Sequence, residues 1–171
     1  MKYASVLVLH MPTENGESIL FTKRSLAVDS HKGQISFPGG MNEPIDLDPL
    51  ETAIRETCEE IGVCEKEIEI TGASNPIHSR NQDFLIYPYT ARIISCSSFK
   101  LSQEVEKIIL VPVLWLKNPA NVFLETLIDE KGNTKTLAKF KPYQDEVIWG
   151  ITAAIVMQVL EKSRGRQTSA F

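Results

Sequence analysis

The alternation of apolar and polar positions predicts a chain of short strands with one central and one C-terminal helix. Strands are expected where β-branched and aromatic residues form short runs, at residues 3–10, 18–23, 68–73, 84–94, 122–129 and 134–140. Turn-forming residues at 12–16 and 130–133 separate two pairs of these runs and indicate hairpins. Apolar positions repeat at helical spacing from residue 145 to 160. The pattern therefore predicts an α/β fold with a mixed sheet between helices.

The central helix is marked by its own start and stop signals. Asp48 is a suitable N-cap, Pro49 fits the first helical position, and Glu51 follows the cap by three residues. Gly62 stands where a helix commonly ends in a glycine. A buried stripe is expected from the apolar positions at helical spacing, Leu50, Ile54, Cys58 and Ile61.

Three acidic residues crowd the second half of this helix, largely off the apolar stripe: Glu56, Glu59 and Glu60. Side chains three and four residues apart share a helix face, and like charges there repel. A hard cation such as Mg2+, which takes oxygen ligands and retains water for substrate phosphates, would offset that repulsion. The alternative interpretation is an ordinary solvated acidic helix. The Phe-Pro-Gly-Gly loop at 37–40, at a fixed distance before the helix, favours a metal site.

The segment from Gly40 to Val63 resembles the signature of the Nudix hydrolases, Gly-x5-Glu-x7-Arg-Glu-U-x-Glu-Glu-x-Gly-U, where U is apolar. Residues 55–62 match its charged core. Asp46 stands where the family has glutamate, the second gap is eight residues instead of seven, and Thr57 occupies the first apolar position.

The departures, together with an upstream motif, resemble the coenzyme A pyrophosphatase branch of this family. That branch carries approximately Leu-Leu-Thr-x-Arg-Ser, then an arginine, then Gly-x3-Phe-Pro-Gly-Gly; here residues 20–25 and 33–40 correspond. Asp29 stands where the branch has its second arginine. Residues 147–154 also resemble the branch, as do Glu104-Val105 leading into Val111-Pro112-Val113, so the resemblance extends from about residue 20 to residue 160.

The resemblance implies an α/β/α sandwich and a site that holds Mg2+ or Mn2+. The implied metal ligands are Glu56, Glu59, Glu60 and the main-chain carbonyl of Gly40, and the implied catalytic residues are Glu56, Glu59, Glu104 and the supporting Arg55. Glu104 is our first choice for the general base, with Glu56 and Glu59 as alternatives. An equally good interpretation of Glu104 is a solvated loop or helix-cap residue.

Substrate contacts are implied for the residues of the upstream motif, Lys23, Arg24, Ser25 and Gly39. Metal ions together with Lys23, Arg24 and Arg80 would supply the positive charge that an anionic substrate needs. His31 and His78 are interpreted as loop histidines without a special role. Tyr87, Tyr89 and Trp149 are interpreted as core residues, because aromatics at strand or helix spacing usually pack.

The expected function is hydrolysis of a pyrophosphate linkage in a nucleoside diphosphate derivative. Coenzyme A or acyl-coenzyme A is the leading substrate, giving adenosine 3′,5′-bisphosphate and 4′-phosphopantetheine products. Because a carboxylate at Asp29 disfavours an extra phosphate, ADP-ribose, NADH and diadenosine polyphosphates stay open as alternatives. A non-catalytic nucleotide-sensing domain is a third option, although such domains normally lose the acidic residues that are all present here.

Composition limits the domain count, the kinds of partner and the cellular compartment, without changing this assignment. With 171 residues and 43% apolar content the chain suffices for one domain, which we place at 1–162, with 163–171 as a flexible tail. A net charge of −4 without a basic run argues against nucleic-acid binding. No segment is typical of a targeting or membrane signal. Three cysteines without disulfide or metal-ligand spacing suit a reducing cytoplasm, with Cys58 as a core residue. A small-molecule nucleotide is the expected partner, and a homodimer is one option for assembly.

Overall fold

The computed structural model describes residues 2–26, 32–79, 83–96, 98–128 and 134–167. Asp29, His31 and Arg80, which the sequence singled out, lie outside these residues. So do the expected turn at 130–133 and the last four residues of the expected tail. Of the described helices, none has the length and apolar content that crossing a membrane requires.

A mixed sheet forms the centre of the molecule. Strand β1 (Tyr3–Thr13) runs parallel to β7 (Leu85–Ile93) and antiparallel to β2 (Gly16–Arg24). The other strands of this sheet are β3 (Ile35–Ser36), β4 (Gly39–Met41), β5 (Ile68–Ala73), β6 (Ile77–His78) and β8 (Val105–Pro112). A separate hairpin is formed by β9 (Val122–Ile128) and β10 (Thr134–Phe140).

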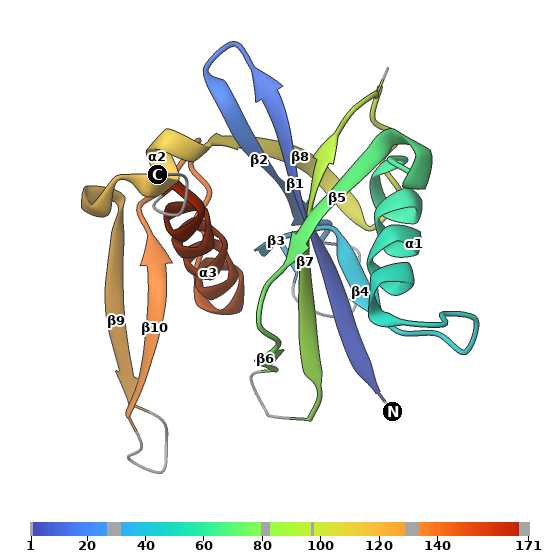
Figure 1. Cartoon of the computed structure of the whole chain (residues 1–171). Helices are drawn as coiled ribbons and strands as arrows, with labels where there is room; N and C mark the ends of the chain where they lie inside the picture. The colour runs from blue at the N-terminus through green and yellow to red at the C-terminus, as the bar shows by residue number, and fades with distance from the viewer. Residues whose placement is uncertain (1, 27–31, 80–82, 97, 129–133, 168–171) are drawn as a thin grey trace.

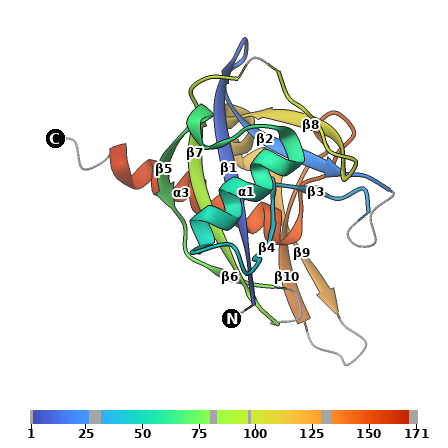
Figure 2. The same cartoon turned by 90° about the vertical axis from the view of Figure 1, so that its right-hand side faces the viewer.

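Two helices cover opposite faces of this sheet. Helix α1 (Pro49–Ile61) packs on one face and α3 (Gly150–Gln167) on the other, with the β9–β10 hairpin along the outer side of α3 (Figure 1). Figure 2, seen from the α1 side, shows α1 lying across the strands. Short helices Val113–Lys117 (α2), Glu65–Glu67 and Pro119–Asn121 connect the strands. The arrangement confirms the expected α/β/α sandwich.

Each face of the sheet has its own apolar core, because successive strand residues point to opposite sides. The core beneath α1 includes Leu7, Leu9, Leu20, Ala53, Ile61 and Ala91. The core beneath α3 includes Val8, Ile19, Phe21, Phe37, Val156 and Val159. The sequence-based strands are all present, with β1 and β2 longer than expected.

The start of the last helix was predicted wrongly. The helix begins at Gly150 and continues to Gln167, whereas the apolar pattern indicated residues 145–160. Tyr143 and Glu146 exchange two backbone hydrogen bonds across a tight turn, in which Gln144 and Asp145 have φ angles of 50° and 64°. These left-handed residues form a two-residue hairpin turn, which a helix cannot contain.

Helix α1 begins and ends as predicted, but its buried face is different. Asp48 accepts from the backbone N–H of Glu51, and Gly62 is left-handed with a φ of 74°. The buried residues are Thr52, Ala53, Thr57, Glu60 and Ile61, whereas Leu50, Ile54 and Cys58 of the predicted stripe are only partly buried. Thr57 tolerates burial because its hydroxyl donates to the carbonyl of Ala53 at 2.7 Å.

Cys58 and Cys64 form a disulfide across the end of α1, which corrects the expectation of unpaired cysteines. Cys58 lies on the last turn of the helix and Cys64 just beyond Gly62, so the helix end brings the two residues together. The left-handed turn at Gly62 reverses the chain, and this reversal is not visible as a disulfide spacing in the sequence. Cys96 is free.

Replacing Cys64 by serine should lower the free energy of unfolding by about 2 kcal/mol under oxidising conditions, since the disulfide restricts a short loop of the unfolded chain. Urea unfolding with and without dithiothreitol measures this difference. Reductant should bring the native chain to the level of the variant, whereas Cys96→Ser should respond to reductant as the native chain does. A native chain whose stability is indifferent to reductant would contradict the prediction.

Candidate active site

The glycine loop places main-chain atoms against the acidic face of α1. A Cβ atom on Gly39, whose φ is 149°, would collide with the carbonyl of Ser5 and with Val6 on β1. A Cβ atom on Gly40 would lie 2.5 Å from the carboxyl carbon of Glu56. The two glycines therefore let the loop fit between strand β1 and helix α1.

Arg55 links most of the acidic groups. Its Nε and NH2 atoms donate to the two oxygens of Asp46 at 2.9 and 3.0 Å, and NH2 also donates to the carbonyl of Met41. Its NH1 atom donates to Glu56 at 2.9 Å and to Glu59 at 3.3 Å. Hydrogen bonds from Arg55 hold the pKa of Asp46 well below its usual range, and the same bonds raise the pKa of Arg55. The bidentate pair thus fixes the guanidinium beside two carboxylates of the helix.

Glu60 points inward, toward the glycine loop, with only 6% of the residue exposed. Its Oε2 atom accepts from the backbone N–H of Gly39 at 3.2 Å, and its Oε1 atom lies 3.6 Å from Arg24 NH1. Burial raises the pKa of Glu60 to about 7, although the Gly39 N–H and Arg24 oppose this shift. Its placement corrects the expectation that all three glutamates lie off the buried stripe.

Arg24 and Glu104 come to the same site from β2 and from the segment before β8. Arg24 NH2 donates to Glu104 Oε2 at 3.2 Å, while the Arg24 Nε is buried without a partner among the described residues. The carbonyl of Glu104 accepts from the backbone N–H of Ser25 at 2.7 Å. The Glu104 side chain is 58% exposed. Arg24 therefore lies between a buried and an exposed carboxylate, Glu60 and Glu104.

Lys23 lies in a different ionic cluster. Its Nζ atom is 2.9 Å from Glu146 and 3.3 Å from Glu106, and Lys107 Nζ is 2.8 Å from the same oxygen of Glu146. This cluster attaches the tight turn at 143–146 to strands β2 and β8. Among the described residues, the ion pairs of Lys23 do not include the acidic residues of α1. No sequence pattern indicated Glu146 or Lys107, because their partnership depends on the turn.

The aromatic and histidine candidates lie in different surroundings. Tyr89 packs against the core beneath α1, and Tyr87 makes an edge-to-face contact with Tyr3 at 5.7 Å between ring centroids. Trp149 is 36% exposed, so its assignment to the core was wrong. His78 lies exposed on the short strand β6.

The comparisons with known proteins agree with this geometry. The NUDIX domain family matches residues 1–129. The chain belongs to the Nudix hydrolase family. This match includes the glycine loop, Arg55, Glu56, Glu59 and Glu60.

Individual Nudix relatives are moderately similar. A probable nudix hydrolase, C6G9.05, of Schizosaccharomyces pombe is 35% identical over 161 residues, which cover 93% of this chain and 55% of the relative. This chain thus spans about half the length of that protein. The human mitochondrial coenzyme A diphosphatase NUDT8 is 30% identical over 162 residues, covering 92% of this chain and 68% of the relative.

Among solved structures, the NUDIX domain of Shewanella oneidensis NrtR, in complex with ADP ribose, has a TM-score of 0.57 and 16% identity. The match covers 96% of this chain and 87% of that chain. At this identity the likeness supports the Nudix fold alone.

The acidic groups of this Nudix site suit a divalent cation, although no three of the described His, Cys, Asp or Glu residues converge on one point. Arg55 draws Glu56 and Glu59 toward itself, and Glu60 turns toward Gly39. The raised pKa of Glu60 reflects burial that its present partners do not fully offset. A nearby cation would provide that missing compensation, so these oxygen donors fit a hard divalent cation.

In metal-free protein, the free energy of unfolding should fall as pH rises from about 4.5 to about 7. The folded-state pKa of Glu60 is raised from 4.5 to about 7, so the folded chain binds more protons in this window. The contribution of Glu60 to the free energy of unfolding is greatest below pH 4.5. It decreases as pH rises through this window, on the order of 1 kcal/mol per pH unit. Urea unfolding across this range measures the slope, and Glu60→Gln should reduce it. An unchanged slope in that variant would contradict the assignment.

Proposed function

We propose that this protein hydrolyses a pyrophosphate linkage in a nucleoside diphosphate derivative, with coenzyme A or acyl-coenzyme A as substrate. The products would be adenosine 3′,5′-bisphosphate and 4′-phosphopantetheine or its acylated form. One observation carries the reaction class: a helix face on which Arg55 holds Glu56 and Glu59, beside a buried Glu60 that contacts the glycine loop.

In this proposal the main-chain carbonyl of Gly40 and the side chains of Glu56, Glu59 and Glu60 would hold Mg2+ or Mn2+. When bound, the divalent cation neutralises phosphate charge and lowers the pKa of a water molecule. Arg55 orients Glu56 and Glu59 through its hydrogen bonds and is itself held by Asp46. Preorganised groups of this kind need little rearrangement during the reaction.

We assign removal of the water proton to Glu104, because its carboxylate is exposed and oriented by Arg24. Glu56 and Glu59 are the alternatives, but each already accepts a hydrogen bond from Arg55. The Nε of Arg24 has no partner among the described residues, which supports a role in binding a phosphate oxygen. Ser25 and Gly39 would contribute beside it, and Lys23 would have to exchange an ion pair for the substrate.

Two observations support coenzyme A over the other candidate substrates. Residues 20–25 and 33–40 resemble the motif of the coenzyme A pyrophosphatase branch, and a human relative carries the name coenzyme A diphosphatase. Asp29 favours the runner-up, a pyrophosphatase acting on ADP-ribose, NADH or a diadenosine polyphosphate, because a carboxylate repels an additional phosphate.

Product analysis after incubation with Mg2+ or Mn2+ tests the proposal. The panel would hold coenzyme A, acetyl-coenzyme A, ADP-ribose, NADH and a diadenosine polyphosphate. Release of adenosine 3′,5′-bisphosphate from coenzyme A is the expected result. Cleavage of a different compound would retain the reaction class and reject the substrate. If none is cleaved but nucleotides bind, the protein is a sensor and the proposed activity is wrong.

The Asp29→Arg variant tests the substrate assignment within the same assay. Coenzyme A cleavage should increase if the carboxylate limits recognition of the extra phosphate, because the variant restores the arginine of the branch. ADP-ribose, which lacks that phosphate, serves as the comparison substrate. Equal changes for both compounds would separate Asp29 from phosphate recognition.

A cytoplasmic location and a homodimer are further parts of this proposal. The Cys58–Cys64 disulfide argues against the cytoplasmic location, because the cytoplasm usually keeps thiols reduced. Size-exclusion chromatography with light scattering would measure whether the protein is a homodimer.

A further inference from the structure

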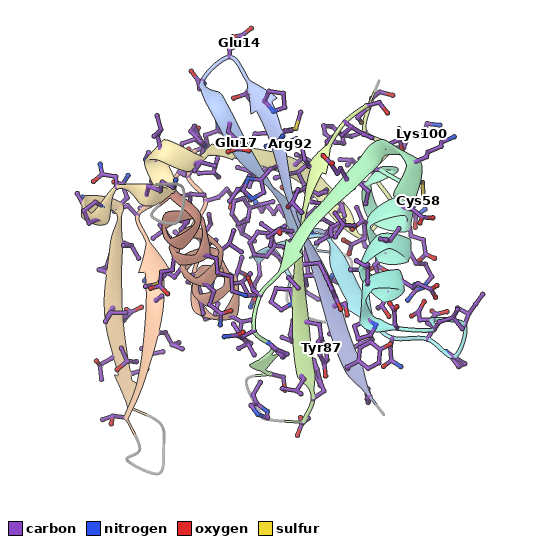
Figure 3. All side chains as sticks on the ribbon, viewed as in Figure 1. Glu14, Glu17, Cys58, Tyr87, Arg92 and Lys100 are labelled. Carbon is purple, nitrogen blue, oxygen red and sulfur yellow. A yellow bond between two sulfur atoms is a disulfide. The ribbon has the colours of Figure 1, made fainter. Side chains whose placement is uncertain are left out.

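A hollow of about 300 Å3 lies on the face of the sheet opposite α1, between four strands and the end of α3. Its wall is formed by His10, Glu17, Thr71, Ala73, Ser74, Thr90, Arg92, Val159 and Lys162. Figure 3 labels Glu17 and Arg92 at this end of the sheet, away from Cys58 on α1. The glutamates of the candidate active site take no part in this wall.

The hollow is rich in hydrogen-bond donors that are not fully used. Arg92 makes no side-chain hydrogen bond with the described residues; its nearest carboxylate oxygen, on Glu17, is 3.8 Å away. Lys162 Nζ donates to the carbonyl of Ala73 at 2.8 Å, which uses one of its three N–H groups. Ser74 is 9% exposed, and its hydroxyl oxygen has no partner among the described residues. An unpartnered buried hydroxyl is costly unless something binds to it.

The other polar groups set the charge of the hollow. Thr71 donates to the Thr90 hydroxyl at 3.1 Å, which leaves the Thr90 hydroxyl hydrogen available to a ligand. His10 Nδ1 lies 3.5 Å from Glu17, and burial lowers the pKa of this histidine, which favours the neutral ring. Arg92 and Lys162 then outweigh the single carboxylate of Glu17. The lining residues therefore carry two cations and one carboxylate, and Glu69 lies opposite Arg92 in the pairing of β5 with β7, outside this lining.

We propose that this hollow binds a phosphate group, either as free inorganic phosphate or as the phosphomonoester of a nucleotide. A guanidinium, an ammonium and hydroxyls, carried by β5, β7, the residue after β5 and α3, suit a tetrahedral oxyanion with several acceptor oxygens. The volume exceeds that of one phosphate and leaves room for part of an attached group. The site is separate from the proposed catalytic residues, and the proposal does not depend on the proposed activity.

The test is a titration of metal-free protein with inorganic phosphate and, separately, with AMP, followed by amide chemical shifts in NMR spectra. Shifts are expected at Thr71, Ser74 and Arg92. Arg92→Gln and Lys162→Gln should each raise the Kd about tenfold, as the loss of one charge-assisted hydrogen bond predicts. Arg24→Gln removes an arginine from the active-site face. It should leave unchanged the Kd that is measured from the shifts of these amides.

The two ligands distinguish the source of the phosphate. Tighter binding of AMP identifies a nucleotide phosphomonoester, whereas binding of inorganic phosphate alone identifies the free ion. Absence of shifts at these amides with both ligands would overturn the proposal, as would binding that is equally strong in Arg92→Gln and Lys162→Gln. Because the Arg92 side chain is 58% exposed and Lys162 is also exposed, both variants should fold, and circular dichroism checks this.

Discussion

Replacing Glu60 by glutamine is expected to reduce kcat on the order of 1,000-fold while leaving the fold intact, comparable to removing a group that stabilises charge in the transition state. Glutamine has nearly the same shape and still accepts the hydrogen bond from the Gly39 N–H. The lost property is the negative charge, which the proposed mechanism needs beside a divalent cation. Because burial makes that charge costly, the variant should be at least as stable as the native protein near pH 7.

Steady-state kinetics on the cleaved substrate, together with urea unfolding, measure both parts of this expectation. Glu69→Gln is the matched control, since Glu69 is an exposed glutamate on β5. That variant should retain full activity. A Glu60→Gln protein with native kcat would remove Glu60 from the proposed metal ligands, whatever its stability.

Replacing Asp46 by asparagine is expected to lower the free energy of unfolding by about 3 kcal/mol, the cost of breaking a buried ion pair by removing one partner. The Asp46 side chain is 3% exposed and accepts two hydrogen bonds from Arg55. Without this carboxylate the guanidinium loses its bidentate anchor. The orientation of Glu56 and Glu59, which depends on Arg55, should then weaken, and activity should fall as well.

Glu59→Gln is the matched control, because it removes another carboxylate from the same arginine. Its side chain is 61% exposed, and exposed pairs contribute about 0–1 kcal/mol. Chemical denaturation at pH 7 compares the two variants. The loss for Asp46→Asn should diminish on acidification, since the pKa of Asp46 is depressed by Arg55 and its stabilisation disappears as this carboxyl protonates. Equal losses in the two variants would mean that Asp46 does not anchor Arg55.

The candidate site could be predicted from sequence where its residues are close along the chain. Glu56, Glu59 and Glu60 occupy one helix whose capping residues are explicit, so their proximity follows from helix geometry. The inward turn of Glu60 was missed because it depends on the N–H of Gly39, 21 residues earlier. The partnership of Arg24 with Glu104 spans 80 residues, and the family resemblance indicated each residue separately but not their contact.

The difference between local and long-range contacts also explains the errors in the predicted fold. Apolar spacing alone extended the last helix back to residue 145, but a left-handed turn at Gln144 and Asp145, held by hydrogen bonds between Tyr143 and Glu146, occupies that segment. Local spacing also placed Cys58 in the core. A disulfide instead forms where the chain reverses at Gly62.

The sequence by itself determined the longer strands other than β8, the limits of α1 and the Nudix signature, because each depends on residues within a few turns or one hairpin. Only the tertiary structure decided which face of α1 is buried, how Asp46 holds Arg55, and that Lys23 pairs with Glu146. It also placed His10, Ser74, Arg92 and Lys162 around one hollow. These features depend on contacts between distant segments, whose geometry is set by how sheet and helices pack and not by any local pattern.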